Sequence, residues 1–224
     1  MVMEKISLVM TSLNPNEFKI NRALQSAVGF DDIIFHIDFN TSLIPKIESS
    51  KINPPFTEFY IKEHLGIGQA YNAMIKHIES EWICCFCDDD FFDEKELAKL
   101  LVAIRAGDFA DADIIHFKCH VSGNRPYHPW GAAKIKQEWL EEGNIIPAAS
   151  FFRKSAWVKV GGFRGEIYHD WILWLRALKA GCRFKYFDGC VYWFMMRPDS
   201  AAVRQTSGMT SEEARENVIK YANE

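Results

Sequence analysis

Short hydrophobic runs alternate with stretches of helical periodicity through the first half of the chain. The runs have strand length and are rich in apolar or β-branched residues; they cover residues 6–13, 32–38, 58–61, 82–87 and 113–119. Between them, apolar side chains recur at spacings of three and four, as in surface helices, over residues 18–28, 68–78 and 94–105. This alternation favours an α/β fold with a doubly wound, mostly parallel sheet and helices on both faces.

The second half of the chain is less regular. Gly, Pro, His and Trp crowd together over residues 119–143, which predicts an irregular loop within one domain rather than a linker. Beyond it the pattern predicts a short segment over 145–152, a helix from about Lys154, a turn at 161–162, a helix over 170–180, strands over 184–187 and 191–195, and a terminal helix over 211–221 with a Ser-x-Glu cap.

Length and charge narrow the class of protein. The 224 residues are 48% hydrophobic and 14% aromatic, enough for the core of a single domain. A formal charge of -4 and a pI near 6.0 give no general attraction to nucleic acid or to anionic membranes. The apolar segment at the N-terminus is too short to span a membrane and has no signal-peptide cleavage pattern, so we expect a cytoplasmic protein with no transmembrane segment.

Six cysteines are present, and three of them lie close together at Cys84, Cys85 and Cys87. Neighbours on a strand point to opposite faces, so these thiols do not readily pair with each other. We expect reduced, buried thiols. A zinc site is the alternative, but no second cysteine pair stands at ligand spacing.

Polar side chains stand where three of the predicted strands end. These are Ser12, Asp38 and the run Asp88, Asp89 and Asp90. In open α/β sheets ligands bind outside the carboxyl ends of the strands, so we expect these residues to meet at one crevice.

The three consecutive carboxylates of residues 88–90 repel each other unless a cation compensates them. Magnesium and manganese bind one or two carboxylates together with substrate phosphates, which a strand-end Asp-x-Asp supplies. The alternative is a solvated helix N-terminus, where acidic residues are also favoured and where residues 91–101 would form the helix.

A second acidic position follows a glycine-rich turn. The turn Gly161-Gly162 precedes Asp170, which stands at the predicted start of an amphipathic helix. The alternative role for Asp170 is that of a helix N-cap.

Taken together, these elements resemble the inverting family-two glycosyltransferases of the GT-A fold. The opening strand and turn of that family, roughly S-V-V-I-P-T-Y-N, match SLVMTSLN at residues 7–14, and its second strand ends in an aspartate, as here at Asp38. Its G-x-A-x-N element matches GQAYN at 68–72, and its metal motif falls on residues 88–90. G-G-F followed by E-D-W-D-L-W-L-R matches GGF at 161–163 and HDWILWLR at 169–176.

The chain departs from the family pattern at several positions. His169 replaces the glutamate of the E-D pair, Ile172 replaces the following aspartate, and Tyr71 stands at the usual arginine of the 68–72 element. Near the C-terminus the family often has R-x-H-x-x-S, whereas this chain has Met195 and Arg197. Arginine does not ligate a metal, but it binds phosphate oxygens directly.

The resemblance implies a mechanism and a set of site residues. Asp170 would be the general base of an inverting transfer from a nucleotide-diphosphate sugar, and His169 would orient it or touch the acceptor. Asp88 and Asp90 would hold Mn²⁺ or Mg²⁺, and Trp130 and Trp171 are candidate acceptor contacts. The implied donor-binding residues are Ser12, Asn14, Asp38, Gly68, Asn72, Asp88, Asp89 and Arg197. The single domain over 1–224 would hold a nucleotide-binding half over about 1–118, an acceptor-side half over about 119–200 and a C-terminal helix over about 210–223.

Other functions stay open from the residues alone. A nucleotidyltransferase shares a similar sheet and acidic motif, but it opens with a Gly-rich loop that residues 11–15 do not provide. A catalytically silent nucleotide-sugar-binding module would fit the replacements at His169 and Arg197, although Asp170 is retained. A transferase acting on a nucleic-acid base finds no support in the acidic balance. We expect the acceptor to be a carbohydrate. The sequence does not identify the nucleotide base or the sugar of the donor, nor which carbohydrate is the acceptor.

Overall fold

The computed structural model describes residues 4–12, 16–37, 56–59, 65–123, 128–165, 167–196 and 208–224. The strands are β1 (Ile6–Ser12), β2 (Asp32–Ile37), β3 (Phe56–Phe59), β4 (Trp82–Cys87), β5 (Phe91–Phe92), β6 (Ile114–Gly123), β7 (His128–Trp130), β8 (Phe151–Arg153) and β9 (Phe184–Met196). The helices are α1 (Glu17–Ser26), α2 (Ile67–Ile75), α3 (Glu94–Ala106), α4 (Gln137–Glu142), α5 (Lys154–Lys159), α6 (His169–Lys179) and α8 (Ser211–Asn223).

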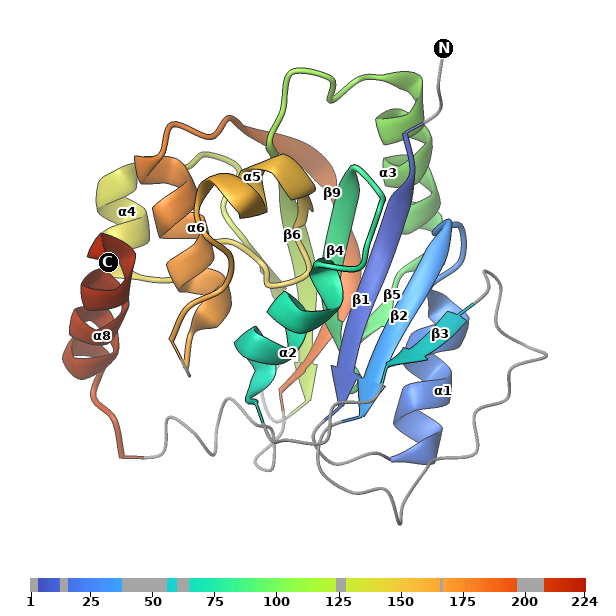
Figure 1. The fold of residues 1–224 in the computed structure, drawn as a ribbon, viewed down its shortest axis with the longest axis horizontal. Coiled ribbons are helices and arrows are strands. Elements are labelled where there is room, and N and C mark those ends of the chain that lie inside the picture. Colours follow the sequence, from blue (N-terminus) through green and yellow to red (C-terminus); the bar gives the residue numbers. More distant parts are fainter. Residues whose placement is uncertain are drawn as a thin grey trace.

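All of these strands belong to one mixed sheet, in the order β3-β2-β1-β4-β8-β6-β9-β5, with β7 paired to β6 (Figure 1). The first four, β1 to β4, run parallel to one another. β8 is inserted antiparallel between β4 and β6, and β5 pairs antiparallel with β9. The α/β sheet predicted from the sequence is confirmed, with its parallel part in the first half and a mixed part in the second.

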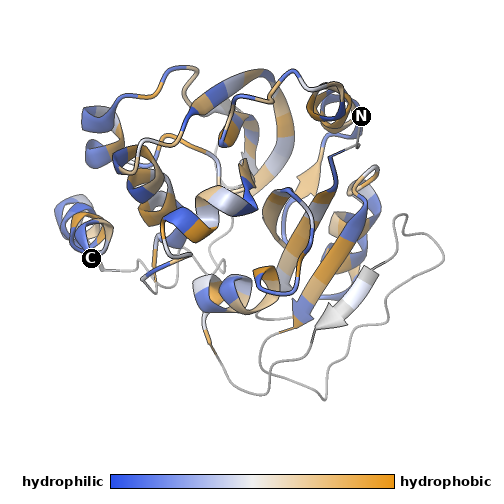
Figure 2. Cartoon of the chain, turned by 45° about the horizontal axis from the view of Figure 1, so that its top comes forward, coloured by the Kyte–Doolittle hydropathy of each residue, from blue (hydrophilic) through white to orange (hydrophobic). Residues whose placement is uncertain are grey.

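The sheet is buried on both faces because its central strands carry apolar residues at successive positions. Along β1, Leu8 and Met10 contribute to the hydrophobic cluster under α1 and α3, whereas Val9 between them contributes to the cluster under α2, α4, α5, α6 and α8. β4 repeats the division, with Cys84 on the first side and Cys85 on the second. Figure 2 shows hydrophobic residues along the central strands and both kinds of residue on the helices. Helices therefore cover both faces, as predicted.

The second half is more regular than its sequence indicates. The stretch predicted to be an irregular loop over 119–143 contains the end of β6, the short strand β7 and helix α4. The two strands predicted over 184–187 and 191–195 are one strand, β9, which pairs in parallel with β6 and has register shifts near Lys118. Local sequence hides this strand because its glycine at 189 and its shifts break the period-two pattern.

Helices α3 and α8 begin at the predicted residues, and the cap of α8 differs from the predicted one. α3 begins at Glu94 with Asp93 as its N-cap, whose side chain accepts from the backbone N–H groups of Lys95 and Glu96. α8 begins with a capping box between Thr210 and Glu213, so the predicted Ser-x-Glu cap is replaced by a Thr-x-x-Glu one.

All six cysteines are free thiols, as expected. Burial raises the pKa of the Cys84 and Cys85 thiols well above the ordinary value, so both are protonated at neutral pH. No helix in the described ranges is both long and apolar enough to cross a membrane.

His116, on β6, predicts a pH dependence of stability. The imidazole is 2% exposed, and burial lowers its pKa to about 4, opposed by a hydrogen bond with the Ala132 backbone. The unfolded chain therefore binds a proton between pH 6.5 and about 4 that the folded chain excludes, and stability falls as pH falls through this window. From pH 7 to pH 5 this group alone should remove about 2 kcal/mol from the free energy of unfolding.

Urea denaturation of the wild type and of His116→Leu at both pH values measures the effect. We expect the variant to lose less stability between pH 7 and pH 5 than the wild type does. Equal losses in the two proteins would show that His116 is not the group responsible.

Candidate functional site

The ends of β1 and β4 are joined by a hydrogen bond between two of the predicted site residues. The register of the two strands pairs Thr11 with Cys87, so the next residue of each, Ser12 and Asp88, lie side by side at the carboxyl end of the sheet. Ser12 Oγ donates to Asp88 Oδ2 at 2.6 Å. Two of the strand-end groups expected to converge thus do so.

The acidic run is not the N-terminus of a helix. The strand β5 separates residues 88–90 from α3, and the N-cap of that helix is Asp93. Asp90 is 6% exposed, and its Oδ1 accepts from the backbone N–H of Met195 at 2.9 Å. Asp90 therefore ties the run to the end of β9, and the solvated-helix interpretation is wrong.

Negative charge is concentrated around this run, as the neighbouring groups show. The pKa of the Cys87 thiol is raised well above its usual value, first by burial and then by the carboxylates of Asp89, Asp90 and Asp88. The pKa of the Tyr192 hydroxyl is also raised, by burial, by Cys119 and then by Asp90, with a smaller contribution from Asp170. Both groups stay neutral at pH 7, and Tyr192 lies within electrostatic reach of the acidic run and of the predicted base.

Asp170 lies in the first turn of α6, but it does not cap that helix. The N-cap is Tyr168, whose backbone is left-handed with φ 58°, and no side chain makes a capping hydrogen bond there. Asp170 Oδ2 instead accepts from Asn144 Nδ2 at 2.8 Å, across the gap between the α4–β8 connection and α6. The N-cap interpretation of Asp170 is therefore wrong, and its carboxylate points toward another element.

His169 packs between the first turns of α6 and α2. Its ring lies 5.8 Å from that of Tyr71 and 5.6 Å from that of Phe163. A Cβ on Gly68 would stand 3.1 Å from the His169 Cβ, so the glycine permits close approach of the two helices. Burial lowers the His169 pKa, against the opposing effect of Asp170, so the imidazole is neutral at pH 7.

Asn72 on α2 holds the glycine-rich turn that leads into α6. Its Nδ2 donates to the carbonyl of Phe163 at 2.9 Å, and its Oδ1 accepts from the Phe163 N–H at 2.8 Å and from Trp157 Nε1 at 3.1 Å. The family resemblance implies donor binding for this amide, and here its polar atoms serve the turn at 161–163.

The two tryptophans expected as acceptor contacts lie in different clusters. Trp171 is 5% exposed, and its indole N–H donates to the Leu140 carbonyl at 2.5 Å, inside the cluster that surrounds α6. Trp130, on β7, is half-buried and packs against the cluster on the other face. The structure does not bring them together.

The remaining predicted positions divide between described and undescribed parts of the chain. Asn14, Asp38 and Arg197 lie outside the described residues. The Asp89 backbone carbonyl accepts from Arg22 on α1 at 3.1 Å.

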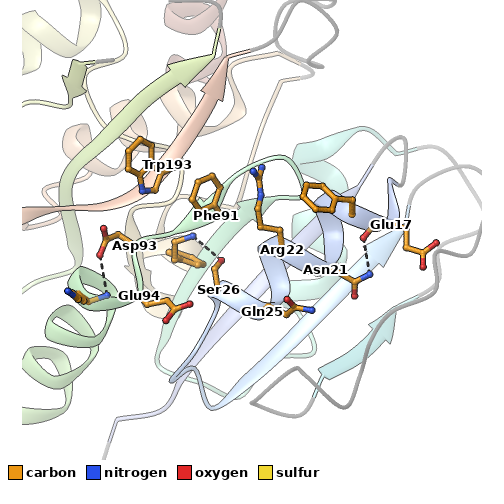
Figure 3. A pocket seen from close by; sticks show the side chains of 12 residues that line it. Glu17, Asn21, Arg22, Gln25, Ser26, Phe91, Asp93, Glu94 and Trp193 are labelled. Carbon is orange, nitrogen blue, oxygen red and sulfur yellow. Dashed lines mark hydrogen bonds between the residues drawn. The ribbon is translucent and has the colours of Figure 1, made fainter. Parts of the chain in front are cut away.

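A groove of about 1090 Å³ opens next to the acidic run, on the side of α1 and β5 (Figure 3). Trp193, Phe91 and Arg22 lie in a row along it. The Phe91 ring is parallel to that of Trp193 within 6°, with centroids 5.9 Å apart, and the Arg22 guanidinium lies 4.2 Å above it. Through its bond to Asp89, Arg22 connects this groove to the strand-end carboxylates.

Comparison with known proteins decides the family. The family described as "Glycosyl transferase family 2" matches residues 7–161, which is more than half of the chain. The chain belongs to glycosyl transferase family 2. The match includes β1, the 68–72 element, the acidic run and the first glycine of the 161–163 turn, and it favours a glycosyltransferase over the nucleotidyltransferase alternative. No curated protein matches the chain.

Solved structures of S. aureus TarS have a similar fold. TarS 1-349 in complex with UDP-GlcNAc superposes with a TM-score of 0.69 at 15% identity, covering 97% of this chain and 65% of that one. The complex of TarS 1-349 with UDP gives a TM-score of 0.66 at 17% identity, covering 98% and 71%. The present chain thus spans less than two thirds of the first of these structures. The likeness confirms the GT-A fold class.

The strand-end donor set of this family 2 chain fits a divalent cation. Among the described residues no three His, Cys, Asp or Glu side chains converge as a complete protein metal site. Magnesium and manganese, however, take only one or two carboxylates when substrate phosphates supply further oxygens. Asp88 and Asp90 are the two carboxylates that would fit such a partial site.

Sequence reasoning missed three groups beside the candidate site residues. They are Asn144, the Tyr192 side chain and the Met195 backbone N–H, which contact Asp170 or lie within reach of Asp90. Each is far from its partner along the chain. Only the fold brings them there, and no local pattern indicates them.

The contacts of Asn72 predict a structural effect of its removal. Asn72→Ala should lower the free energy of unfolding by roughly 1–3 kcal/mol, because the Phe163 backbone groups and the Trp157 indole lose their partner. Asn72→Asp keeps the acceptor for both N–H donors, but it loses the donations to the Phe163 carbonyl and to Gln69 and turns a carboxylate oxygen toward that carbonyl. Urea denaturation should therefore place both variants below the wild type; an alanine variant of unchanged stability would refute this role.

Proposed function

We propose that this chain transfers a sugar from a nucleotide-diphosphate sugar to an acceptor hydroxyl, with inversion at the anomeric carbon. The observation that carries the proposal is the position of Asp170. Its carboxylate does not cap α6 and accepts a hydrogen bond from Asn144, and burial together with both Asp90 and Asp170 raises the pKa of Tyr192. We place the candidate base and the candidate site for the leaving diphosphate in one region, because an in-line displacement requires both.

The donor side is formed by the strand ends. Ser12, Asp88 and Asp89 stand where the diphosphate sugar would bind, and the motif assigns Asn14, Asp38 and Arg197 to the same subsite. The tight packing at Gly68 gives that residue a role in bringing α2 against α6. Because TarS binds UDP-GlcNAc in its complex, we propose UDP-GlcNAc as the first donor to test, followed by GDP-, CDP- and dTDP-sugars.

Asp88 and Asp90 would hold the divalent cation, Mn²⁺ or Mg²⁺. When bound, such an ion supplies positive charge that stabilises the departing nucleotide diphosphate. Ser12 holds one oxygen of Asp88, and the Met195 N–H holds one oxygen of Asp90, so both carboxylates are oriented before any ligand arrives.

Asp170 would act as the base. Its carboxylate takes the proton of the acceptor hydroxyl while that oxygen forms a bond to the anomeric carbon and the bond to the diphosphate oxygen breaks. The electron pair of the broken bond leaves with the nucleoside diphosphate. His169 is neutral and half-buried beside this carboxylate, so it adds no competing positive charge and serves to orient the first turn of α6.

The cation role predicts a difference between two substitutions at one position. Asp90→Asn keeps an oxygen that accepts from the Met195 N–H and removes the charge, whereas Asp90→Ala removes both. We expect both variants to lose the rise in melting temperature that UDP-GlcNAc with Mn²⁺ gives the wild type, a rise that corresponds to several kcal/mol at saturation. Only Asp90→Ala should also lower the melting temperature of the protein alone.

Chelation is the matched control for this experiment. EDTA should abolish turnover of the wild type and leave the melting temperature without ligand unchanged. Turnover that persists in EDTA would remove the cation from the proposal and leave the leaving group to basic residues such as Arg197.

The base role predicts the outcome of Asp170→Asn. The amide keeps the shape of the side chain and an oxygen that can accept from Asn144, but it does not take a proton at neutral pH. Transfer, or hydrolysis with water as the acceptor, should fall at least roughly a hundredfold, a loss of roughly 3 kcal/mol of transition-state stabilisation. Donor affinity from the thermal shift should stay near that of the wild type.

This pair of measurements separates an enzyme from a binding module. Near-normal turnover in Asp170→Asn would exclude Asp170 as the base. A wild type that binds the donor but neither transfers nor hydrolyses it would favour a silent nucleotide-sugar-binding module.

A further inference from the structure

Asn144 contacts the candidate base from an element far away in the sequence. Its Nδ2 donates to Asp170 Oδ2 at 2.8 Å, and the two residues are 26 positions apart. Such charge-assisted hydrogen bonds are shorter and stronger than neutral ones. A role for Asn144 in catalysis rests on the proposed function, because it concerns how Asp170 is held for proton transfer.

The orientation of the Asn144 amide is fixed from its other end. Asn144 Oδ1 accepts from the backbone N–H of Ile146 at 3.2 Å. Because this end must be the oxygen, the end that faces Asp170 must be the NH₂ group, which is the donor that a carboxylate needs. The amide therefore accepts a hydrogen bond from its own loop and donates one to α6.

The loop that carries Asn144 is attached to α6 by a second, independent contact. Trp171, the residue after Asp170, donates its indole N–H to the Leu140 carbonyl in α4. On the far side, the Ala132 N–H donates to the Ile145 carbonyl at 3.0 Å. Asn144 lies between these two attachments, so its position relative to α6 is set by the core rather than by its own hydrogen bond.

We propose that Asn144 is a positioning residue that fixes the Asp170 carboxylate for its work as the base. Holding Oδ2 restricts rotation of the carboxylate and leaves Oδ1 as the oxygen that takes the acceptor proton. A general base must reach within about 3 Å of the proton it removes, and a displacement of about 1 Å can cost a hundredfold in rate. Asn144 contacts Asp170, so it acts through the base in this proposal.

The experiment compares kcat and KM for UDP release from UDP-GlcNAc, with Mn²⁺ present and water as the acceptor. The proteins are the wild type, Asn144→Ala, Asn144→Asp, Asp170→Asn and the double variant Asn144→Ala/Asp170→Asn. Asn144→Asp keeps the acceptor for the Ile146 N–H and places a carboxylate against Asp170 in place of the donor, so it replaces the holding contact by repulsion. Gln137→Ala is the control, because it removes an exposed amide of α4 that bonds to Glu141 instead.

We expect both Asn144 variants to lower kcat roughly ten- to a hundredfold with little change in KM. Gln137→Ala should behave as the wild type. In the Asp170→Asn background, Asn144→Ala should cause almost no further loss, because the group it positions is already absent. Circular dichroism checks that each variant is folded. If Asn144→Ala is not folded, the kcat of Asn144→Asp tests the positioning role.

Each contrary result has a distinct meaning. If Asp170→Asn is inactive and both Asn144 variants keep wild-type kcat, the positioning role is overturned while the proposed function stands. A raised KM at unchanged kcat would make Asn144 a donor contact, and full additivity in the double variant would show that it acts independently of Asp170; both overturn the proposal. A wild type no faster than Asp170→Asn overturns the proposed function, and the role of Asn144 with it.

Discussion

Burial of the sheet on both faces is the constraint on which the rest of the structure depends. One core receives Leu8 and Met10 from β1 and Cys84 from β4, and the other receives Val9 from β1 and Cys85 from β4. Side chains that need water or a ligand are therefore confined to the strand ends. The in-register pairing of these two strands then brings their end residues into contact. Site geometry at this edge is thus a direct consequence of how the core is packed.

The acidic run is stable there because protein groups share its charge before any ligand binds. A hydroxyl from β1 and a backbone N–H from β9 each donate to one carboxylate, and the adjacent Cys87 and Tyr192 stay protonated because burial and the carboxylates raise their pKa values. Ionising either neighbour would add repulsion to a region that already holds three carboxylates. A divalent cation would compensate the remaining negative charge and would bind the oxygens of a diphosphate at the same time.

Asp170, the proposed base, is coupled to the core through α6. Asp170 and Trp171 are consecutive residues, and both bind the segment formed by α4 and the loop after it. Asp170 binds Asn144 in the loop, and Trp171 binds the Leu140 carbonyl in α4. Trp171 contributes to this arrangement by packing in the second core. His169 and Gly68 complete the arrangement, since their close contact sets how the first turn of α6 lies against α2. The geometry around Asp170, the proposed base, therefore depends on the packing inside the second core.

The sequence by itself determined the strands and helices of the first half apart from the short strand β5, together with the α/β class and the positions of the acidic run and Asp170, because period-two and period-3.6 patterns and strand-end carboxylates are local features. It did not determine β9, whose register shifts interrupt the pattern, nor that Asn72 serves a turn. Nor could it find Asn144. Its partner Asp170 lies on another element, and the packing of α4 against α6 decides which side chains meet. Hydrogen bonds between distant segments leave no periodic signal in the chain, so only the tertiary structure shows them.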